Sequence, residues 1–240
     1  RLTAGNHFLC KNEKGKVVWI TEIDGDNLVE FVDRNRTKDD PFFMYWSPLA
    51  VHSSHRDIPE HFAARTTAPQ NRRKLGGGVV AVDDQVGKLL DCLDQHRMRE
   101  NTLVILSSDN GAEGGSSTPY RGGKGAETQQ VSWTLSPTII SWPGVVPQGK
   151  RFDGLCCTLD FYATIASAAK ATPPEHIDGV DLLPYLLGEK AGDVHEHLFW
   201  LNNDPTDAPR RHLVAVRSKN WRLYRYEETE PWQLFDLEKD

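Results

Sequence analysis

The chain has 240 residues, of which 38% are hydrophobic and 26% are charged. A chain of this length can bury a full hydrophobic core, and the composition excludes collagen-like, coiled-coil and low-complexity proteins. The formal net charge is -6, so no broad basic surface indicates binding to nucleic acid or to anionic lipid. No run approaches the roughly 20 apolar residues that a membrane span needs. Composition therefore indicates an ordinary globular protein and allows a local site for a small anion.

The first half of the chain alternates predicted helices and strands. Residues 24–32 begin with acidic residues before an apolar run, which is typical of a short capped helix. Residues 42–46 and 103–106 are short apolar runs, so both are predicted as buried strands. Between them, apolar residues recur every three or four positions over 78–100, the pattern of an amphipathic helix. Two buried strands joined by a long helix predict a right-handed crossover in a mostly parallel sheet, and hence an α/β fold flanked by helices.

The last third of the chain changes character. A third strand is predicted at residues 138–142 and a second amphipathic helix at residues 159–169. Beyond two consecutive prolines the apolar runs are short and separated by turn-like residues, which predicts antiparallel strands at residues 198–201, 213–216, 221–226 and 232–235. We therefore expect an α/β domain over residues 1–172 and a small antiparallel α+β subdomain over residues 173–240.

Polar residues follow two of the predicted strands, where ligands bind in open α/β sheets. His52 comes after strand 42–46, and a histidine can donate a proton or bind an anion near neutral pH. Asp109 and Asn110 come directly after strand 103–106 and place a carboxylate beside an amide oxygen, the ligand types that Ca²⁺ takes. Asp-Asn-Gly is also a common turn sequence, so spacing alone favours a turn over a metal site.

A glycine-rich basic segment, Arg-Gly-Gly-Lys-Gly, occupies residues 121–125. Its glycines allow the backbone and the Lys124 side chain to approach an anion closely, although the spacing is not that of a P-loop. A flexible basic surface loop explains the segment equally well.

Histidine and cysteine pairs give weaker signals. Residues 195–197 read His-Glu-His, but no third metal ligand is in register, so a surface strand is the favoured interpretation. The four cysteines lack the Cys-x-x-Cys spacing of a zinc site, and the adjacent Cys156 and Cys157 are interpreted as buried small apolar residues. Cysteine usage leaves the compartment undecided.

Taken in order, these motifs resemble the C-terminal half of type I sulfatases, the arylsulfatase-like branch of the alkaline phosphatase superfamily. The resemblance covers roughly residues 40–240, and Asp-Asn-Gly followed by Arg-Gly-Gly-Lys-Gly is its most specific part. It implies an alkaline phosphatase-like sheet and a Ca²⁺ site at Asp109 and Asn110. It also implies that Lys124 contacts the sulfate and that His52 lies near the leaving-group oxygen. Sulfate ester cleavage needs such groups, because negative charge develops on the sulfuryl oxygens and on the departing alkoxide.

Two features depart from the family pattern. Sulfatases carry an N-terminal Cys-x-Pro-x-Arg or Ser-x-Pro-x-Arg signature whose first residue becomes formylglycine, and no cysteine or serine of this chain has that context. The Glu-Gly-Gly that usually follows the lysine loop is missing from residues 125–136. We therefore expect a segment of a longer protein whose nucleophile and remaining metal ligands lie upstream, and we expect no turnover by the isolated chain.

The resemblance implies a sulfuric ester hydrolase that acts on a sulfated small molecule or a sulfated glycan. Ca²⁺ and formylglycine are the implied cofactors, and a periplasmic, secreted or lysosomal location is implied. A phosphodiesterase or phosphonate hydrolase of the same superfamily stays open as an alternative, because tetrahedral oxyanions share most binding requirements. So does a non-catalytic relative that binds sulfated glycans, which the altered loop after Lys124 favours. No motif specifies the particular ester or the oligomeric state.

Overall fold

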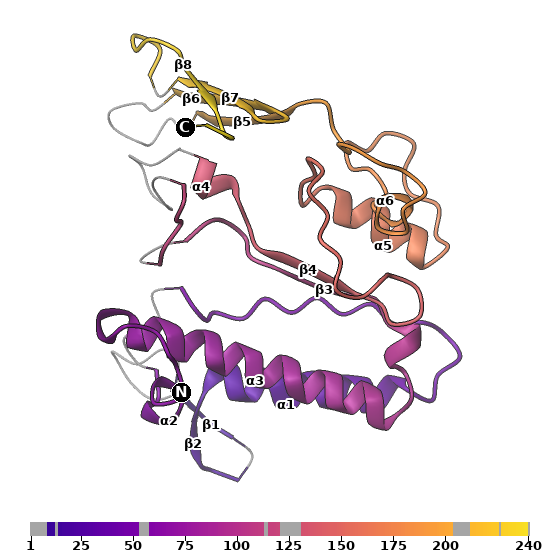
Figure 1. The fold of residues 1–240 in the computed structure, drawn as a ribbon. Coiled ribbons are helices and arrows are strands. Elements are labelled where there is room, and N and C mark those ends of the chain that lie inside the picture. Colours follow the sequence, from indigo (N-terminus) through magenta and orange to yellow (C-terminus); the bar gives the residue numbers. More distant parts are fainter. Residues whose placement is uncertain are drawn as a thin grey trace. The chain divides into compact units, whose positions relative to one another are not determined.

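The computed structural model describes residues 9–12, 14–52, 58–112, 115–120, 131–203, 212–225 and 227–239. The chain divides into two compact units (Figure 1). The first is Arg1–Thr102 with Ala112–Ser116, and the second is Leu103–Gly111 with Ser117–Asp240. The boundary predicted between residues 172 and 173 lies within the second unit and stays a prediction.

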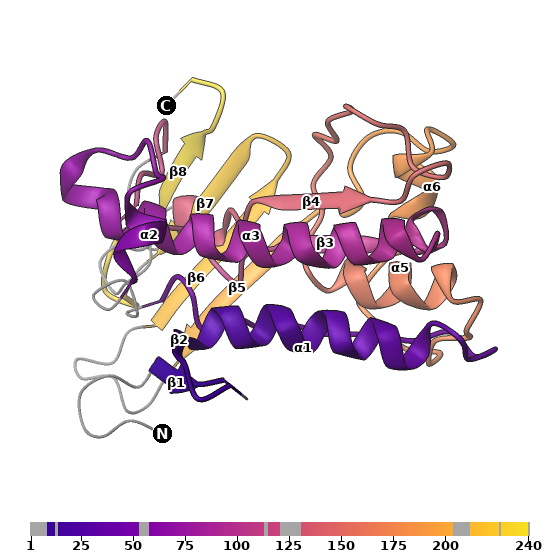
Figure 2. The ribbon, with the colours of Figure 1, turned by 90° about the horizontal axis from the view of Figure 1, so that it is seen from below.

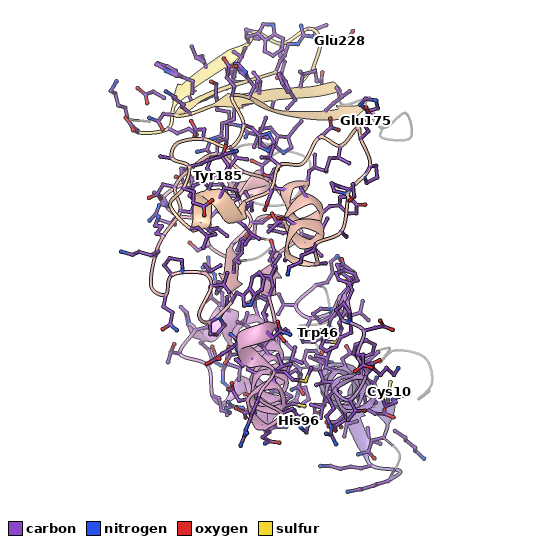
Figure 3. All side chains as sticks on the ribbon, turned by 90° about the vertical axis from the view of Figure 1, so that its right-hand side faces the viewer. Cys10, Trp46, His96, Glu175, Tyr185 and Glu228 are labelled. Carbon is purple, nitrogen blue, oxygen red and sulfur yellow. The ribbon has the colours of Figure 1, made fainter. Side chains whose placement is uncertain are left out.

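Two long helices that lie side by side build the first unit, α1 (Ile20–Asn35) and α3 (Arg73–Gln95) (Figure 1 and Figure 2). Both begin earlier than the sequence pattern predicts. The Glu22 carboxylate accepts the Trp19 backbone N–H at 2.9 Å, which fixes the chain as it enters α1. At the other end, the ring of His96, just past α3, lies 2.8 Å from the Asp33 carboxylate of α1 (His96 is labelled in Figure 3).

The start of α3 is set by close packing against a short helix, α2 (Glu60–Ala63). A Cβ atom on Gly77 would lie 2.7 Å from the Ala63 Cα, so only glycine lets the two backbones approach this closely. A hydrophobic cluster covers the same region; it consists of Trp19, Ile58, Phe62, Ala63 and Ala81. The unit also contains the antiparallel pair β1 (Leu9–Lys11) and β2 (Val17–Trp19) and the 3-10 turns η2 (Gln70–Arg72) and η3 (Arg99–Asn101).

The strand predicted at residues 42–46 is not formed. The segment has no ladder partner among the described residues, and the side chains of Phe43 and Tyr45 are exposed. An apolar run predicts a strand that is covered on both faces, but it does not supply the neighbouring strands that would pair with it. The predicted parallel crossover is therefore absent from the described part of the chain.

The second unit contains the pair β3 (Val104–Ser107) and β4 (Thr138–Ser141). Both strands were predicted within one or two residues, but they pair with each other in the antiparallel sense, with Leu106 opposite Ile139. A buried apolar run does not specify its partner or its direction, so the sequence predicted the two strands but not their antiparallel pairing. Three helices accompany this pair: α4 (Val131–Thr134), α5 (Asp160–Ala168) and α6 (Leu183–Leu186).

The predicted C-terminal antiparallel sheet is confirmed (Figure 1). Its strands follow chain order: β5 (Leu198–Asn203), β6 (His212–Ser218), β7 (Trp221–Arg225) and β8 (Gln233–Asp236). One face of the sheet is buried and includes Ala215 and Arg222, whereas Phe199 and Leu234 on the other face are exposed. None of the helices in the described part of the chain has both the length and the apolar character that a membrane crossing requires.

Candidate functional site

The carboxyl end of β3 is fixed against the beginning of β4. The Ser107 hydroxyl lies 3.0 Å from the Thr138 hydroxyl, and the Ser108 backbone N–H donates to the Pro137 carbonyl at 3.2 Å. These contacts continue the ladder for one residue past the strand. The turn that follows, residues 108–111, therefore leaves a firmly held strand end.

Asp109 and Asn110 lie side by side in this turn. The Asn110 amide nitrogen donates to one oxygen of the Asp109 carboxylate at 2.6 Å, and the Ser108 hydroxyl donates to the Asn110 carbonyl at 2.9 Å. The Asn110 amide nitrogen makes this hydrogen bond, so the amide oxygen lies on the opposite side of the amide group. The Asp109 side chain is exposed. The structure thus places a carboxylate and an amide oxygen, both possible metal ligands, next to each other, as the sequence predicts.

These residues fit a hard divalent cation in donor chemistry but supply only part of a coordination shell. Ca²⁺ takes about six to eight oxygen ligands, so Asp109 and Asn110 require further ligands from elsewhere. The pair also fits the simpler interpretation of a hydrogen-bonded turn. The geometry is therefore consistent with a metal site without being sufficient for one.

His52 ends a turn in the first unit. Its backbone N–H donates to the Leu49 carbonyl at 3.1 Å, and the residue is exposed. Asp109 and Asn110 belong to the second unit, so the structure groups those two residues with each other, and the placement of His52 beside them stays a prediction. Lys124 and the rest of the glycine-rich segment lie outside the described residues.

The structure also joins residues that sequence reasoning kept apart. His195 is not on an exposed strand: β5 begins at Leu198, and the His195 side chain, 16% exposed, lies 2.7 Å from the fully buried Asp160 carboxylate. The interpretation of Cys156 and Cys157 as buried apolar residues is wrong as well, since Cys156 is exposed and Cys157 is only half-buried. Asp160 and His195 are 35 positions apart, and no sequence pattern connects them.

Comparison with known proteins places the chain in a family. The sulfatase family model matches residues 12–171, and the model of the N-sulphoglucosamine sulphohydrolase C-terminal region matches residues 131–240. N-acetylgalactosamine-6-sulfatase of Canis lupus familiaris is 31% identical over 225 residues, which is 90% of this chain and 40% of the relative. Steryl-sulfatase of Rattus norvegicus is 37% identical over 183 residues, which is 71% of this chain and 30% of the relative. The chain belongs to the sulfatase family.

Solved structures agree with this assignment. The crystal structure of Ps i-CgsB in complex with k-i-k-neocarrahexaose has a TM-score of 0.82 at 30% identity, covering 94% of this chain and 50% of that one. The phosphonate monoester hydrolase SpPMH from Silicibacter pomeroyi has a TM-score of 0.64 at 17% identity, covering 98% of this chain and 59% of that one, and so shows the fold alone. The fold is that of the alkaline phosphatase-like sulfatases. The chain spans about half the length of these structures and less of the curated relatives.

Proposed function

We propose that the chain is part of a sulfuric ester hydrolase and that Asp109 and Asn110 contribute ligands to its Ca²⁺. The observation that carries this proposal is the adjacent pair of oxygen donors at the firmly held end of β3, in a chain that belongs to the sulfatase family. A cation there stabilises negative charge on the sulfuryl oxygens as the ester bond breaks.

Two further side chains have proposed roles. Lys124 places a positive charge on the sulfate, and its three N–H donors suit an oxyanion. His52 donates a proton to the departing alkoxide, which removes the need to release a strongly basic leaving group. A formylglycine, when present, supplies the nucleophile that attacks sulfur. These assignments rest on the family motifs; the structure adds only that His52 is exposed.

The proposed substrate is a sulfated sugar or another small sulfate ester. Similar proteins support this class: relatives are N-acetylgalactosamine-6-sulfatases and steryl-sulfatases. One solved neighbour, BT4656, is in complex with its substrate D-Glucosamine-2-N, 6-O-disulfate. A periplasmic, secreted or lysosomal compartment is proposed on the same ground.

The test uses the complete protein that contains these residues. Sulfate release from aryl sulfates and sulfated sugars is measured against Ca²⁺ concentration for the wild type, for Asp109→Asn, and for Asp153→Asn as a control. Asp153 is an exposed carboxylate that pairs with Arg151, so Asp153→Asn removes the same charge from a residue outside the turn at residues 108–111. We expect Asp109→Asn to weaken Ca²⁺ binding in calorimetry by about 10- to 100-fold and to lower sulfate release, with the control unchanged.

The same assay separates the alternatives. Faster hydrolysis of phosphodiesters or phosphonates than of any sulfate ester would identify the protein as another hydrolase of the superfamily. Binding of sulfated glycans without release of sulfate would identify a non-catalytic relative. Equal Ca²⁺ affinity in Asp109→Asn and the wild type would remove the metal-ligand role of the β3 turn.

A further inference from the structure

Asp160, the first residue of α5, is a fully buried carboxylate with several donors around it. One of its oxygens accepts the Cys157 backbone N–H at 2.7 Å. The other accepts the Val180 backbone N–H at 2.9 Å and lies 2.7 Å from the His195 Nε2. A buried carboxylate held by backbone donors keeps a fixed position.

The His195 ring is brought to this carboxylate by backbone contacts that do not involve the ring. The His195 and Val194 backbone N–H groups both donate to the Leu155 carbonyl at 3.1 Å. The Leu155 N–H in turn donates to the Asp193 carboxylate at 2.7 Å. Residues 193–195 are therefore hydrogen-bonded to the segment before α5. These bonds hold the His195 imidazole near Asp160 without a bound ligand.

Cys157 completes a group of three different ligand types. Its Sγ lies 3.9 Å from the His195 Nε2, and the sulfur, the nitrogen and an Asp160 oxygen all lie within 4.8 Å of one another. This is not the arrangement of a nucleophilic triad, in which the thiol and the carboxylate contact opposite ring nitrogens. Here both contact Nε2, so the carboxylate cannot orient the ring from the far side, and the three atoms converge on one point.

We infer that Cys157, Asp160 and His195 form a binding site for Zn²⁺ or a similar thiophilic divalent cation. Zn²⁺ takes ligands at about 2.3 Å for sulfur and about 2.0 to 2.2 Å for nitrogen and oxygen, so tetrahedral ligands lie about 3.3 to 3.6 Å apart. The His195 Nε2 lies 2.7 Å from the Asp160 oxygen, below that range, and 3.9 Å from the Cys157 Sγ, above it. Small movements of the three side chains suffice.

The charges and protons of this site balance. Zn²⁺ displaces the thiol proton of Cys157, which leaves to solvent, and it binds His195 as the neutral imidazole through Nε2, with the ring proton on Nδ1. The thiolate and the Asp160 carboxylate together offset the charge of the cation, and a water takes the fourth position, since His195 and Cys157 both retain some exposure. Sulfur and nitrogen ligands disfavour Ca²⁺, so this site is chemically distinct from the oxygen pair at Asp109 and Asn110.

A second group in the described chain, Asp33, Cys92 and His96, has the same composition and serves as a comparison. Its carboxylate is half exposed and also lies 3.5 Å from the Arg36 guanidinium, a cation that competes with a metal for Asp33. Its Cys92 side chain is buried, whereas Cys157 is only half-buried and so easier for an ion to reach. The first group is therefore the stronger site.

The test is a titration of the 240-residue protein with Zn²⁺ and, separately, with Co²⁺. We expect one bound ion whose binding releases protons, seen as a calorimetric enthalpy that depends on the buffer, and a thiolate-to-cobalt charge-transfer band in the near ultraviolet. Cys157→Ser and His195→Gln are each expected to weaken binding at least tenfold and to remove or shift that band. Cys156→Ser and Cys92→Ser are matched controls that should leave both unchanged.

Three results would overturn the inference: no stoichiometric Zn²⁺ binding, a cobalt spectrum without a thiolate band, or a loss of binding in Cys92→Ser in place of Cys157→Ser. The cobalt spectrum needs no variant, so a missing thiolate band overturns the inference even if a substitution prevents folding, which circular dichroism reveals. Failure of Zn²⁺ binding leaves Ca²⁺ binding at Asp109 untouched, because the two titrations use different ions and different residues.

Discussion

The guanidinium of Arg222, on β7, lies over the indole ring of Trp200, on β5, at 4.9 Å from the ring centroid. Arg222 is fully buried, and its Nη1 also donates to the Thr134 hydroxyl of α4 at 3.1 Å. Burial lowers the pKa of Arg222 to about 10. The aromatic face and the hydroxyl offset part of this desolvation, and they connect the C-terminal sheet to the helix before β4.

Replacing Trp200 with Leu should therefore destabilise the second unit. The buried guanidinium loses the negative face of the ring, and we expect the free energy of unfolding in urea to fall by about 2 kcal/mol. Phe199→Leu is the matched control, because Phe199 is the adjacent residue on the opposite face and is 73% exposed. The control should change stability by less than about 0.5 kcal/mol. Equal losses in the two variants would show that the cation–ring contact contributes nothing.

Gly77→Ala should destabilise the first unit through a backbone clash. The added Cβ would lie 2.7 Å from the Ala63 Cα, and backbone atoms of α2 cannot move aside as a flexible side chain does. A loss of about 1 to 3 kcal/mol is expected in chemical denaturation. Gly87→Ala makes the same chemical change in the same helix where nothing lies within 4 Å, and it should stabilise by about 0.5 to 1 kcal/mol. Effects of the same sign would contradict the packing account.

Alkylation of Cys156 should be slow at ordinary pH. Although Cys156 as a residue is exposed, partial desolvation of its thiol, together with the Asp160 carboxylate and Cys157, raises the pKa of the thiol from 9.0 to about 11. The reactive thiolate at pH 8 is then about 100-fold scarcer in the native protein than in the unfolded chain. Iodoacetamide labelling, followed by peptide mass spectrometry without added metal, should keep rising about tenfold per pH unit up to pH 10. A plateau near pH 9 in the native protein would be the contrary result.

The same pKa shift has a stability consequence. The native thiol binds its proton more tightly than the unfolded one, so the unfolded state holds fewer protons between pH 9.0 and about 11. The contribution of Cys156 to stability is therefore complete below pH 9.0 and is lost as the pH rises toward about 11. Cys156→Ser should flatten this part of the curve of unfolding free energy against pH.

The isolated chain should not hydrolyse sulfate esters. None of its cysteines or serines stands in the signature that becomes formylglycine, so the 240 residues carry no activated nucleophile of the family type. Incubation with an aryl sulfate and Ca²⁺ is expected to release sulfate at the rate of the blank. Robust release that Lys124→Ala abolishes would reveal a different nucleophile within the chain.

Much of the local structure followed from periodicity. The recurrence of apolar residues at three and four positions predicted the body of α3, and short apolar runs predicted β3, β4 and the C-terminal strands, because these patterns depend only on which face of an element is buried. The ends of the helices were less accurate. α3 extends back through Gly77 because α2 packs on it, and that contact outweighs the low helix propensity of glycine.

The sequence by itself determined the family, since the order of Asp109-Asn110, the lysine loop and the later motifs is a linear property of the chain. It also placed Asp109 and Asn110 at a strand end, as the structure confirms. Only the tertiary structure decided that β3 pairs antiparallel with β4 and that Asp160 meets His195. The reason is physical: strand partners and contacts between distant side chains are chosen by packing and by backbone hydrogen bonds across the fold, which no local pattern records.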